Sequence, residues 1–390
     1  MARKIKDSGI EWIGEIPEGW ETINPKALFA QRKDRASKGE RQLTSSQQYG
    51  ILYQDEYMEL TGSKVVTVEK DFDILKHVET GDFVISMRSF QGGLEYSTKS
   101  GAISSAYVML VPNLELVYPR FYRWLLKSSV YIDALQRTTN MVRDGQAMRY
   151  SNFAQVRLFT LPLDEQKSRA DFLDLECSSI DKILFKTRSS IEEYKKLKQA
   201  VITQAVTEGT PAMFSSPHSV KLKYLISIVS GEAIRNEQLS DFGEYPVYGG
   251  GEIIGFCSQY NTSEGSLIIG RVGARCGCVT HTTCKSWATD NALIVLPTCN
   301  AKYMYYVIGH CQLNNLNTSN AQPLITSTKI KNVVVPYFSD AMQQQEIADY
   351  LDAKCAKIDG LIAKKEQLVK ELESYKKSLI YEVVTGKREV

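Results

Sequence analysis

The 390-residue sequence lacks any long hydrophobic run. Its longest apolar stretches, such as residues 106–111, are far shorter than the roughly 20 residues that a membrane-spanning helix needs. Glycine (25) and proline (11) make up less than a tenth of the chain, which excludes collagen-like and low-complexity proteins. The first fifteen residues mix charges of both signs without an apolar segment. We therefore expect no signal peptide, no membrane association and a cytoplasmic location.

Cysteine is also sparse, since eight residues in a chain of this length are too few for a disulfide scaffold. Six of them lie in one region, together with His281 and His310: Cys257, Cys276, Cys278, Cys284, Cys299 and Cys311. A structural zinc site is one interpretation, because zinc prefers four Cys or His ligands. However, residues 276–278 form CxC instead of a paired CxxC, and the first half of the chain has no equivalent cysteines. We favour reduced thiols and expect no metal.

Motifs of several enzyme classes are missing as well. The sequence contains no GxxxxGK[ST] phosphate loop, and none of its four histidines has HExxH spacing. It has no Asp/Asn-Pro-Pro-aromatic motif, which an adenine methyltransferase needs to hold a flipped base, and no acidic and lysine cluster typical of a nuclease. The chain is therefore not expected to be an enzyme.

The strongest positive signal is an internal repeat. With a shift of 178 residues, positions 170–207 align without a gap on positions 348–385, and 13 of the 38 pairs are identical. Neither copy contains proline, and both show apolar residues at alternating spacings of four and three. This heptad pattern predicts two long helices that pack against each other. An amphipathic helix packed on a globular core is the alternative.

The predicted seam contains these residues: Leu173, Ile180, Leu184, Ile191, Tyr194, Val201, Leu351, Ile358, Ile362, Val369, Leu372 and Leu379. Both seams are interrupted at the same two positions, Thr187/Lys365 and Lys198/Lys376. Polar residues in a seam can fix helix register at some cost in stability.

The segments before each helix correspond more weakly. Residues 81–88 resemble 265–271, and residues 106–112 resemble 291–297; all are short apolar runs next to turn residues, which predicts strands. We therefore predict an α+β protein with a pseudo-two-fold internal repeat. Its expected segments are a first globular domain (1–160), a helix (161–210), a second globular domain (211–334) and a second helix (335–390).

Candidate DNA-reading residues are polar side chains on predicted turns. Arg, Asn and Gln can bond purine edges, whereas Lys and Ser more often hold phosphate. The candidates in the first globule are Arg88, Ser89, Gln91, Arg143, Gln146, Arg149 and Tyr150. Those in the second are Arg271, Arg275, Asn320, Gln322 and Lys329. Ordinary solvated loop polarity is the alternative for each of them, and the net charge of +2 neither demands nor excludes a polyanionic partner.

Taken in order, these segments resemble the specificity subunit of type I restriction-modification systems. The resemblance covers essentially the whole chain. Three of its motifs are residues 12–20 (WIGEIPEGW), 81–86 (GDFVIS) and 161–166 (LPLDEQ). The others lie within and at the ends of both predicted helices. These are 172–174 (FLD) with 350–352 (YLD), 180–181 with 358–359 (ID), and 205–209 (AVTEG) with 383–387 (VVTGK). Two departures are the start of the second helix at 342–344 (MQQ), where the family usually shows Pro and Glu-Gln, and Glu208-Gly209 instead of Gly-Lys.

The resemblance implies two target-recognition domains separated by two long antiparallel helices that act as a spacer. Each domain would read one half of a gapped bipartite site in double-stranded DNA. The helices would dock two methyltransferase subunits, and restriction subunits with translocase activity would join them. S-adenosylmethionine, ATP and Mg²⁺ are implied for those partners, and no cofactor for this chain.

Two other interpretations remain open. One is an enzyme with unrecognised motifs, which binding of S-adenosylmethionine by the isolated chain would favour. The other is a coiled-coil scaffold that binds only protein. An assembled complex without salt-dependent DNA affinity would favour this scaffold, because phosphate contacts make affinity fall with salt.

Overall fold

The computed structural model describes residues 4–68, 72–87, 89–138, 148–211, 216–316 and 324–390. The chain forms two compact units. Unit 1 contains residues 1–186 and 368–390, and unit 2 contains residues 187–367. No helix in the described ranges is both long and apolar enough to cross a membrane.

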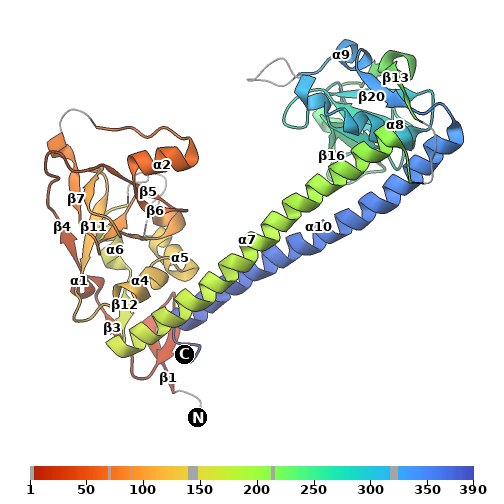
Figure 1. Ribbon diagram of the computed structural model, residues 1–390. Coiled ribbons are helices and arrows are strands. Elements are labelled where there is room, and N and C mark those ends of the chain that lie inside the picture. Colours follow the sequence, from red (N-terminus) through yellow and green to blue (C-terminus); the bar gives the residue numbers. More distant parts are fainter. Residues whose placement is uncertain (1–3, 69–71, 88, 139–147, 212–215, 317–323) are drawn as a thin grey trace. The chain divides into compact units, whose positions relative to one another are not determined.

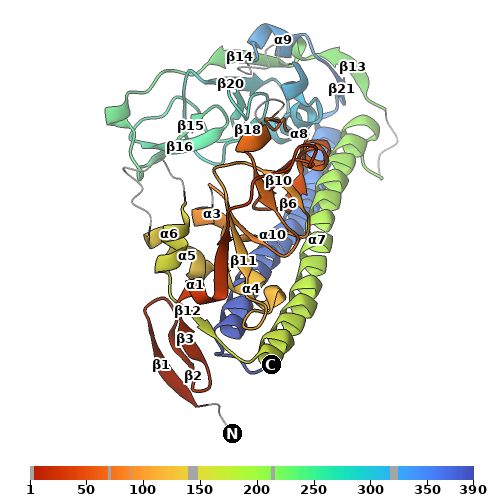
Figure 2. The same ribbon diagram turned by 90° about the vertical axis from the view of Figure 1, so that its left-hand side faces the viewer.

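Unit 1 is built on a four-stranded antiparallel sheet with the order β4-β11-β8-β9 (Figures 1 and 2). These strands are Phe29–Arg32, Val108–Pro112, Phe83–Ile85 and Glu95–Tyr96. The three residues of β8 are buried and apolar, as expected for a strand inside a sheet. Smaller pairs are β1 (Ile5–Ile10) with β2 (Gly14–Pro17), β3 (Glu21–Ile23) with β12 (Leu158–Thr160), β5 (Leu43–Ser46) with β6 (Gly50–Tyr53), and β7 (Lys76–Val78) with β10 (Gly101–Ile103).

Besides its parts of two long helices, unit 1 contains six short α-helices within the described residues. They are α1 (Pro25–Leu28), α2 (Gln54–Thr61), α3 (Ser89–Gly92), α4 (Pro119–Leu125), α5 (Ser129–Arg137) and α6 (Tyr150–Gln155). Helix α4 begins with Pro119, whose fixed φ suits the first helical position.

Unit 2 repeats this topology. Its four-stranded antiparallel sheet has the order β14-β20-β17-β18, with strands Ile226–Ser230, Ala292–Pro297, Leu267–Gly270 and Val279–His281. Strands β13 (His218–Lys221) and β21 (Val334–Tyr337) pair as β3 and β12 do, while β16 (Glu252–Cys257), β15 (Tyr245–Gly249) and β19 (Trp287–Ala288) form a third sheet. Its shorter helical segments are η2 (Leu222–Tyr224), η3 (Asn236–Gln238), α8 (Ala301–His310), η4 (Leu313–Leu316) and α9 (Ser327–Lys331). The predicted strands at 81–88, 106–112, 265–271 and 291–297 are thus β8, β11, β17 and β20, and the α+β prediction is confirmed.

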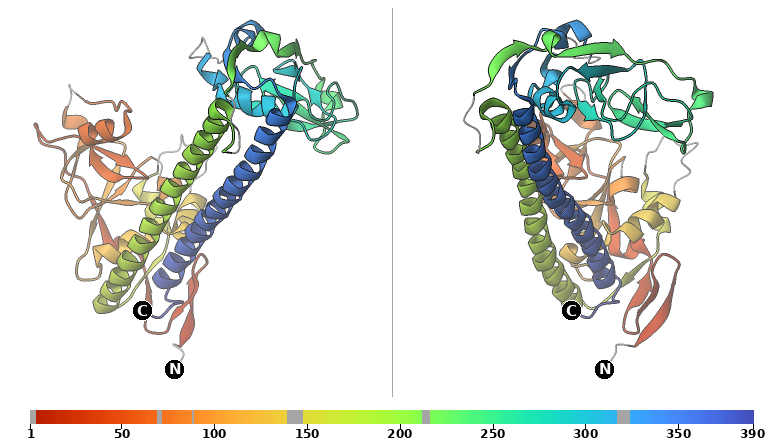
Figure 3. Two further views of the ribbon diagram at one scale, coloured as in Figure 1. Left: turned by 45° about the vertical axis from the view of Figure 1, so that its right-hand side comes forward. Right: turned by 90° about the vertical axis from the view of Figure 1, so that its right-hand side faces the viewer.

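Two long helices, α7 (Leu163–Glu208) and α10 (Ala341–Val384), contribute to both units. In each unit a part of α7 lies beside a part of α10 (Figure 3). Within unit 1, Arg169 contacts the Val383 carbonyl and Asp181 contacts Lys376, so the two helices run antiparallel. The predicted seam residues are all buried or half-buried.

The shared seam interruption at Lys198 and Lys376 has a structural role. The Lys198 Nζ lies 2.6 Å from the Asp359 carboxylate in unit 2, and the Lys376 Nζ lies 2.6 Å from the Asp181 carboxylate in unit 1. The two pairs occupy equivalent positions of the repeat. Each lysine keeps its stem at the seam and turns its charge toward an aspartate at the edge of the opposite helix.

The ends of the long helices pack against the globular parts. The core of unit 1 includes Leu173 and Leu379, and the core of unit 2 includes Ala205 and Leu351. The helix bounds fall inside the predicted segments, but the division into compact units cuts both helices. The reason is that apolar residues near the helix ends are buried against the neighbouring globule.

Candidate nucleic-acid interface

Five of the twelve predicted DNA-reading residues lie outside the described residues: Arg88, Arg143, Gln146, Asn320 and Gln322. The other seven lie in segments that border these positions in each unit. The candidate site in each unit therefore consists of these bordering segments and the contacts that hold them in place.

The first loop of unit 1 follows β8 and contains α3. Gln91 is exposed there, and its role in reading DNA stays a prediction. Ser89 is 1% exposed, and its Oγ accepts a hydrogen bond from the Ser86 backbone N–H, so the prediction that Ser89 faces DNA is wrong. Gly93 fixes this turn, because it has φ +76° and an added Cβ would lie 2.4 Å from the Leu126 carbonyl oxygen.

Asn152 of unit 1 links the described segments on either side of residues 139–147. The Asn152 side chain donates to the Thr138 carbonyl and accepts from the Arg149 backbone N–H. The residue Arg149 itself is exposed. Tyr150 is half-buried at the start of α6, and its hydroxyl donates to the Phe29 carbonyl, so it packs against the core and the prediction for it needs correction.

The corresponding first loop of unit 2 is the turn of residues 271–278 after β17. Its backbone is closely hydrogen-bonded: the Gly277 N–H donates to the Gly270 carbonyl, and the Gly270 N–H donates to the Cys278 carbonyl. A Cβ on Gly270 would lie 2.2 Å from the Gly250 carbonyl oxygen, so only glycine fits there. The turn carries Arg271, which is half-buried, and Arg275, which is exposed.

The segment that begins at residue 324 meets this turn. The Ile325 N–H donates to the Arg271 carbonyl, so residues 271–278 and the segment after 323 lie side by side. The Lys329 Nζ donates to the Leu316 carbonyl and joins the two ends of residues 317–323. Arg271 and Arg275 thus lie on one turn, whereas the side chain of Lys329 in the neighbouring segment bonds the protein backbone. Arg275 forms an exposed ion pair with Glu252 at 2.8 Å.

A pair of glutamines, which the sequence analysis did not single out, holds each globule to a long helix. Gln166 is fully buried; its Oε1 accepts from the Tyr118 N–H, and its Nε2 donates to the Leu116 and Leu161 carbonyls. The repeat-equivalent Gln344 accepts from the Asn300 N–H and donates to the Phe338 carbonyl. Tyr118 and Asn300 cap α4 and α8. The signal was present, because positions 166 and 344 are also related by the 178-residue shift.

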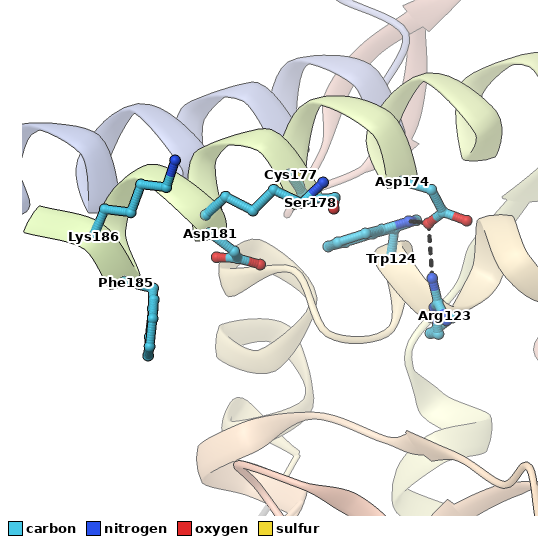
Figure 4. Close-up of a pocket in the computed structure, with 9 residues that line it drawn as sticks. Arg123, Trp124, Asp174, Cys177, Ser178, Asp181, Phe185 and Lys186 are labelled. Atoms are coloured by element: carbon cyan, nitrogen blue, oxygen red, sulfur yellow. Dashed lines mark hydrogen bonds and ion pairs between the residues drawn. The ribbon is translucent and has the colours of Figure 1, made fainter. Parts of the chain in front are cut away.

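A pair of aspartates adds a second attachment. Asp174 accepts from Arg120 and from Trp124 on α4 (Figure 4). Burial raises the pKa of Asp174, but these hydrogen bonds outweigh burial and hold its pKa below the usual range.

The repeat-equivalent Asp352 accepts from Lys302 and Tyr306 on α8. Its pKa is likewise lowered, since these contacts exceed the opposing effect of burial. Both globules are thus attached through the same two positions of the repeat, and these attachments set where the loops stand.

The cysteine-rich region shows no metal-binding geometry in the described residues. No group of three or more His, Cys, Asp or Glu side chains there is close enough to hold an ion. Cys276 is buried and donates to the Arg271 carbonyl, whereas Cys278 and Cys284 are exposed.

Comparisons with known proteins agree with this architecture. Residues 218–371 match the family model of the type I restriction modification DNA specificity domain. A 110-residue stretch is 29% identical to the type I restriction enzyme EcoprrI specificity subunit of Escherichia coli. That match covers 28% of this chain and 27% of the relative.

Solved structures share the fold along the whole chain. A structure from a study of complex assembly and conformational transition of the type I R-M system has a TM-score of 0.71 at 13% identity, covering 96% of this chain and 99% of that one. The HsdS subunit from Thermoanaerobacter tengcongensis has a TM-score of 0.52 at 14% identity, covering 96% and 98%. Residues 218–371 thus match the type I restriction modification DNA specificity domain, and the chain as a whole has a fold like that of these two solved structures.

Proposed function

We propose that this chain is the non-catalytic, DNA-reading specificity subunit of a type I restriction-modification complex. Each unit reads one half of a gapped, bipartite site in double-stranded DNA. The observation that carries the proposal is the repeated topology: both units have a four-stranded sheet of the same strand order, and a segment with an exposed polar side chain, Gln91 or Arg275, follows the equivalent strand, β8 or β17.

The chemistry of these loops suits direct readout of bases. Gln91 and Arg275 are exposed side chains of types that can make two hydrogen bonds to a purine edge in the major groove. Both stand on turns whose backbone is fixed by glycine and hydrogen bonds. Fixed turns reduce the entropy that is lost when side chains are ordered on binding.

The helices carry a second proposed surface, which we call the apolar ridge: Ile183, Leu197, Leu361 and Tyr375. Their side chains are 37–48% exposed although they are large and apolar. The heptad register places Ile183 near Tyr375 in unit 1 and Leu197 near Leu361 in unit 2. Ile183 is equivalent to Leu361 in the repeat, and Leu197 to Tyr375.

An exposed apolar pair at the same place in both units fits two copies of one partner. We propose that the ridge docks two methyltransferase subunits. These subunits, and not this chain, would bind S-adenosylmethionine. Restriction subunits that use ATP and Mg²⁺ would join the same assembly.

Mapping of methylated adenines tests the reading function. The chain is co-expressed with the methyltransferase subunit encoded beside it, in a host without adenine methylation. We expect a gapped two-part motif that disappears when this chain is omitted. Replacement of the loop residues 271–278 by those of another specificity subunit is expected to change only one half of the motif. If a stable complex methylates no motif, the scaffold interpretation is favoured.

The docking surface is tested by Ile183→Glu in unit 1 and Leu361→Glu in unit 2. A charge placed in an apolar contact is expected to weaken binding at least tenfold, about 1.4 kcal/mol, so native mass spectrometry of either variant should show one methyltransferase copy fewer. Leu175→Glu is the control, because Leu175 is 66% exposed on α7 but lies outside the ridge. Two copies retained by both ridge variants would contradict the docking proposal.

A further inference from the structure

The hairpin of β15 and β16 packs its tip against the turn of residues 271–278 in unit 2. The carbonyl of Gly250 at this tip lies so close to Gly270 that no side chain fits between them. The next residue, Gly251, has φ +102°, and a Cβ on it would lie 3.8 Å from the Cβ of Arg275. Glycines thus allow the backbone of the hairpin to lie directly beside the stem of Arg275.

An ion pair joins the hairpin to the turn. The Glu252 Oε1 on β16 lies 2.8 Å from the Arg275 Nη1, and the two side chains are 60% and 51% exposed. Such an exposed pair adds little to stability, because water screens the charges and two long side chains lose freedom. Its main effect is therefore local: the carboxylate holds the guanidinium on a turn that is proposed to read DNA.

The carboxylate also restricts the groups of DNA that Arg275 can bond. A contact between Arg275 and a phosphate would bring Glu252 next to another negative charge, and like charges across an interface weaken binding. Base edges carry no net charge, so the paired guanidinium can still donate to them. In the major groove guanine offers two acceptors, N7 and O6, whereas each of the other three bases offers at most one.

We propose that Arg275 reads a guanine in the half-site of unit 2 and that Glu252 is its positioning residue. The guanidinium donates to N7 and O6 of the base, while the carboxylate of Glu252 fixes its direction and disfavours phosphate contacts. The inference rests on the proposed function and deepens it, because it names one base of the target and the residue that makes its reading selective.

Unit 1 provides an internal comparison. Its hairpin of β5 and β6 also packs against the segment after β8, since a Cβ on Gly92 would lie 2.7 Å from the Gln47 Cγ. However, residues 43–53 of this hairpin include neither Asp nor Glu. This hairpin thus offers no carboxylate to an arginine, so the loss of Glu252 should affect only one half of the target.

Two other roles of Glu252 predict different results. If Arg275 binds phosphate, Glu252 restrains it, and removal of the carboxylate would strengthen binding to every DNA sequence and steepen the salt dependence. If Glu252 itself accepts a hydrogen bond from a cytosine N4 amino group, its removal would relax the requirement for cytosine and leave the guanine contact intact.

DNA that contains 7-deazaguanine tests the proposal with the complex of this chain and its methyltransferase subunits. Mapping of methylated adenines supplies the motif, and replacement of residues 271–278 assigns the half that unit 2 reads. Each guanine of that half, on either strand, is replaced in turn by 7-deazaguanine, which lacks the N7 acceptor. Dissociation constants are measured by fluorescence anisotropy at one fixed salt concentration, because affinity depends steeply on salt.

We expect one guanine whose replacement weakens binding of the unaltered complex about fivefold or more. Arg275→Met should weaken binding to the guanine duplex by a similar factor and make the two duplexes equivalent. Glu252→Gln keeps the shape of the side chain and removes its charge. This variant should also bind the guanine duplex more weakly, and its 7-deazaguanine effect should fall to about twofold or less.

Glu264→Gln is the matched control, because Glu264 is exposed in unit 2 but precedes β17, whereas the turn follows it. It should leave the 7-deazaguanine effect unchanged. Guanines in the half read by unit 1 should respond equally in all of these complexes.

Four results would overturn the inference. They are stronger binding of Glu252→Gln to motif and unrelated DNA alike, a relaxed requirement for cytosine with an unchanged guanine effect, an equal 7-deazaguanine effect in the Arg275→Met and unaltered complexes, and no responsive guanine in that half. Any of them together with a normal gapped motif refutes only the reading by Arg275. An unaltered complex that methylates no motif refutes the proposed function itself.

Discussion

The attachment of each globule to its long helix gives a quantitative prediction. Gln166→Leu and Gln344→Leu replace a buried amide by an apolar side chain of similar size. Gln166 satisfies three backbone groups, the Tyr118 N–H and the carbonyls of Leu116 and Leu161. Gln344 satisfies two, the N–H of residue 300 and the carbonyl of residue 338.

The expected loss follows from the number of groups left without a partner. A buried polar group that loses its hydrogen bond costs about 1–3 kcal/mol. Some of these groups are partly exposed, so the lower limit applies: about 3 kcal/mol for Gln166→Leu and about 2 kcal/mol for Gln344→Leu. The exposed Gln204 on α7 provides the control, and Gln204→Leu should change stability by less than about 0.5 kcal/mol.

Hydrogen exchange of backbone amides measures the two units separately, which one denaturation curve does not. Gln166→Leu should lower protection in α4 and β12 of unit 1, and Gln344→Leu should lower it in α8 and β21 of unit 2. Losses below about 0.5 kcal/mol in both variants would refute the reasoning, because the glutamines would then not hold the globules. A larger loss for Gln344→Leu than for Gln166→Leu would refute the count of bonds.

Two further predictions concern unit 1. Burial lowers the pKa of His77, but hydrogen bonds with Glu40 and Glu79 outweigh this and raise it above its usual 6.5. The stability that these hydrogen bonds add is fully present below pH 6.5 and is lost as pH rises through the folded pKa of His77. NMR titration should therefore show a raised pKa for His77. The variant His77→Gln should remove this pH dependence of stability. The second prediction concerns Arg169, which is 1% exposed and donates to Glu165 and to the Val383 carbonyl. The variant Arg169→Met should lower the free energy of unfolding by about 3–5 kcal/mol and expose the backbone amides of residues 385–390 to hydrogen exchange. Full protection of these amides in the variant would contradict the prediction.

Regular features were predictable from the sequence alone. The heptad spacing located both long helices, and the buried apolar runs located β8, β11, β17 and β20, because each pattern reflects a periodic burial. The sequence also suggested that Lys198 and Lys376 fix register. It could not show that their partners are Asp359 and Asp181, since a heptad pattern does not determine which residues of two antiparallel helices stand opposite.

The candidate site was less predictable for a physical reason. Polar side chains on turns can face solvent or satisfy the backbone, and the sequence does not distinguish these outcomes. Ser89 and Tyr150 satisfy backbone groups, whereas Gln91 and Arg149 are exposed. Gln166 belongs to the LPLDEQ motif, but its burial was not predictable, because a glutamine at a helix start is usually an exposed residue.

The two units preserve their attachments but differ in their loops, and this difference bears on the DNA target. Positions 166/344, 174/352, 181/359 and 198/376 carry identical residues in both copies. The turn after β17 carries Arg271 and Arg275, whereas the segment after β8 carries Arg88 and Gln91. Equal attachments place each loop in the same way on its own helix segment, so the half-sites should differ because the loop side chains differ. We therefore expect a non-palindromic target with two different halves, which mapping of methylated adenines will show directly. A palindromic motif would mean that the bases are read by the attachments the units share and not by these loops.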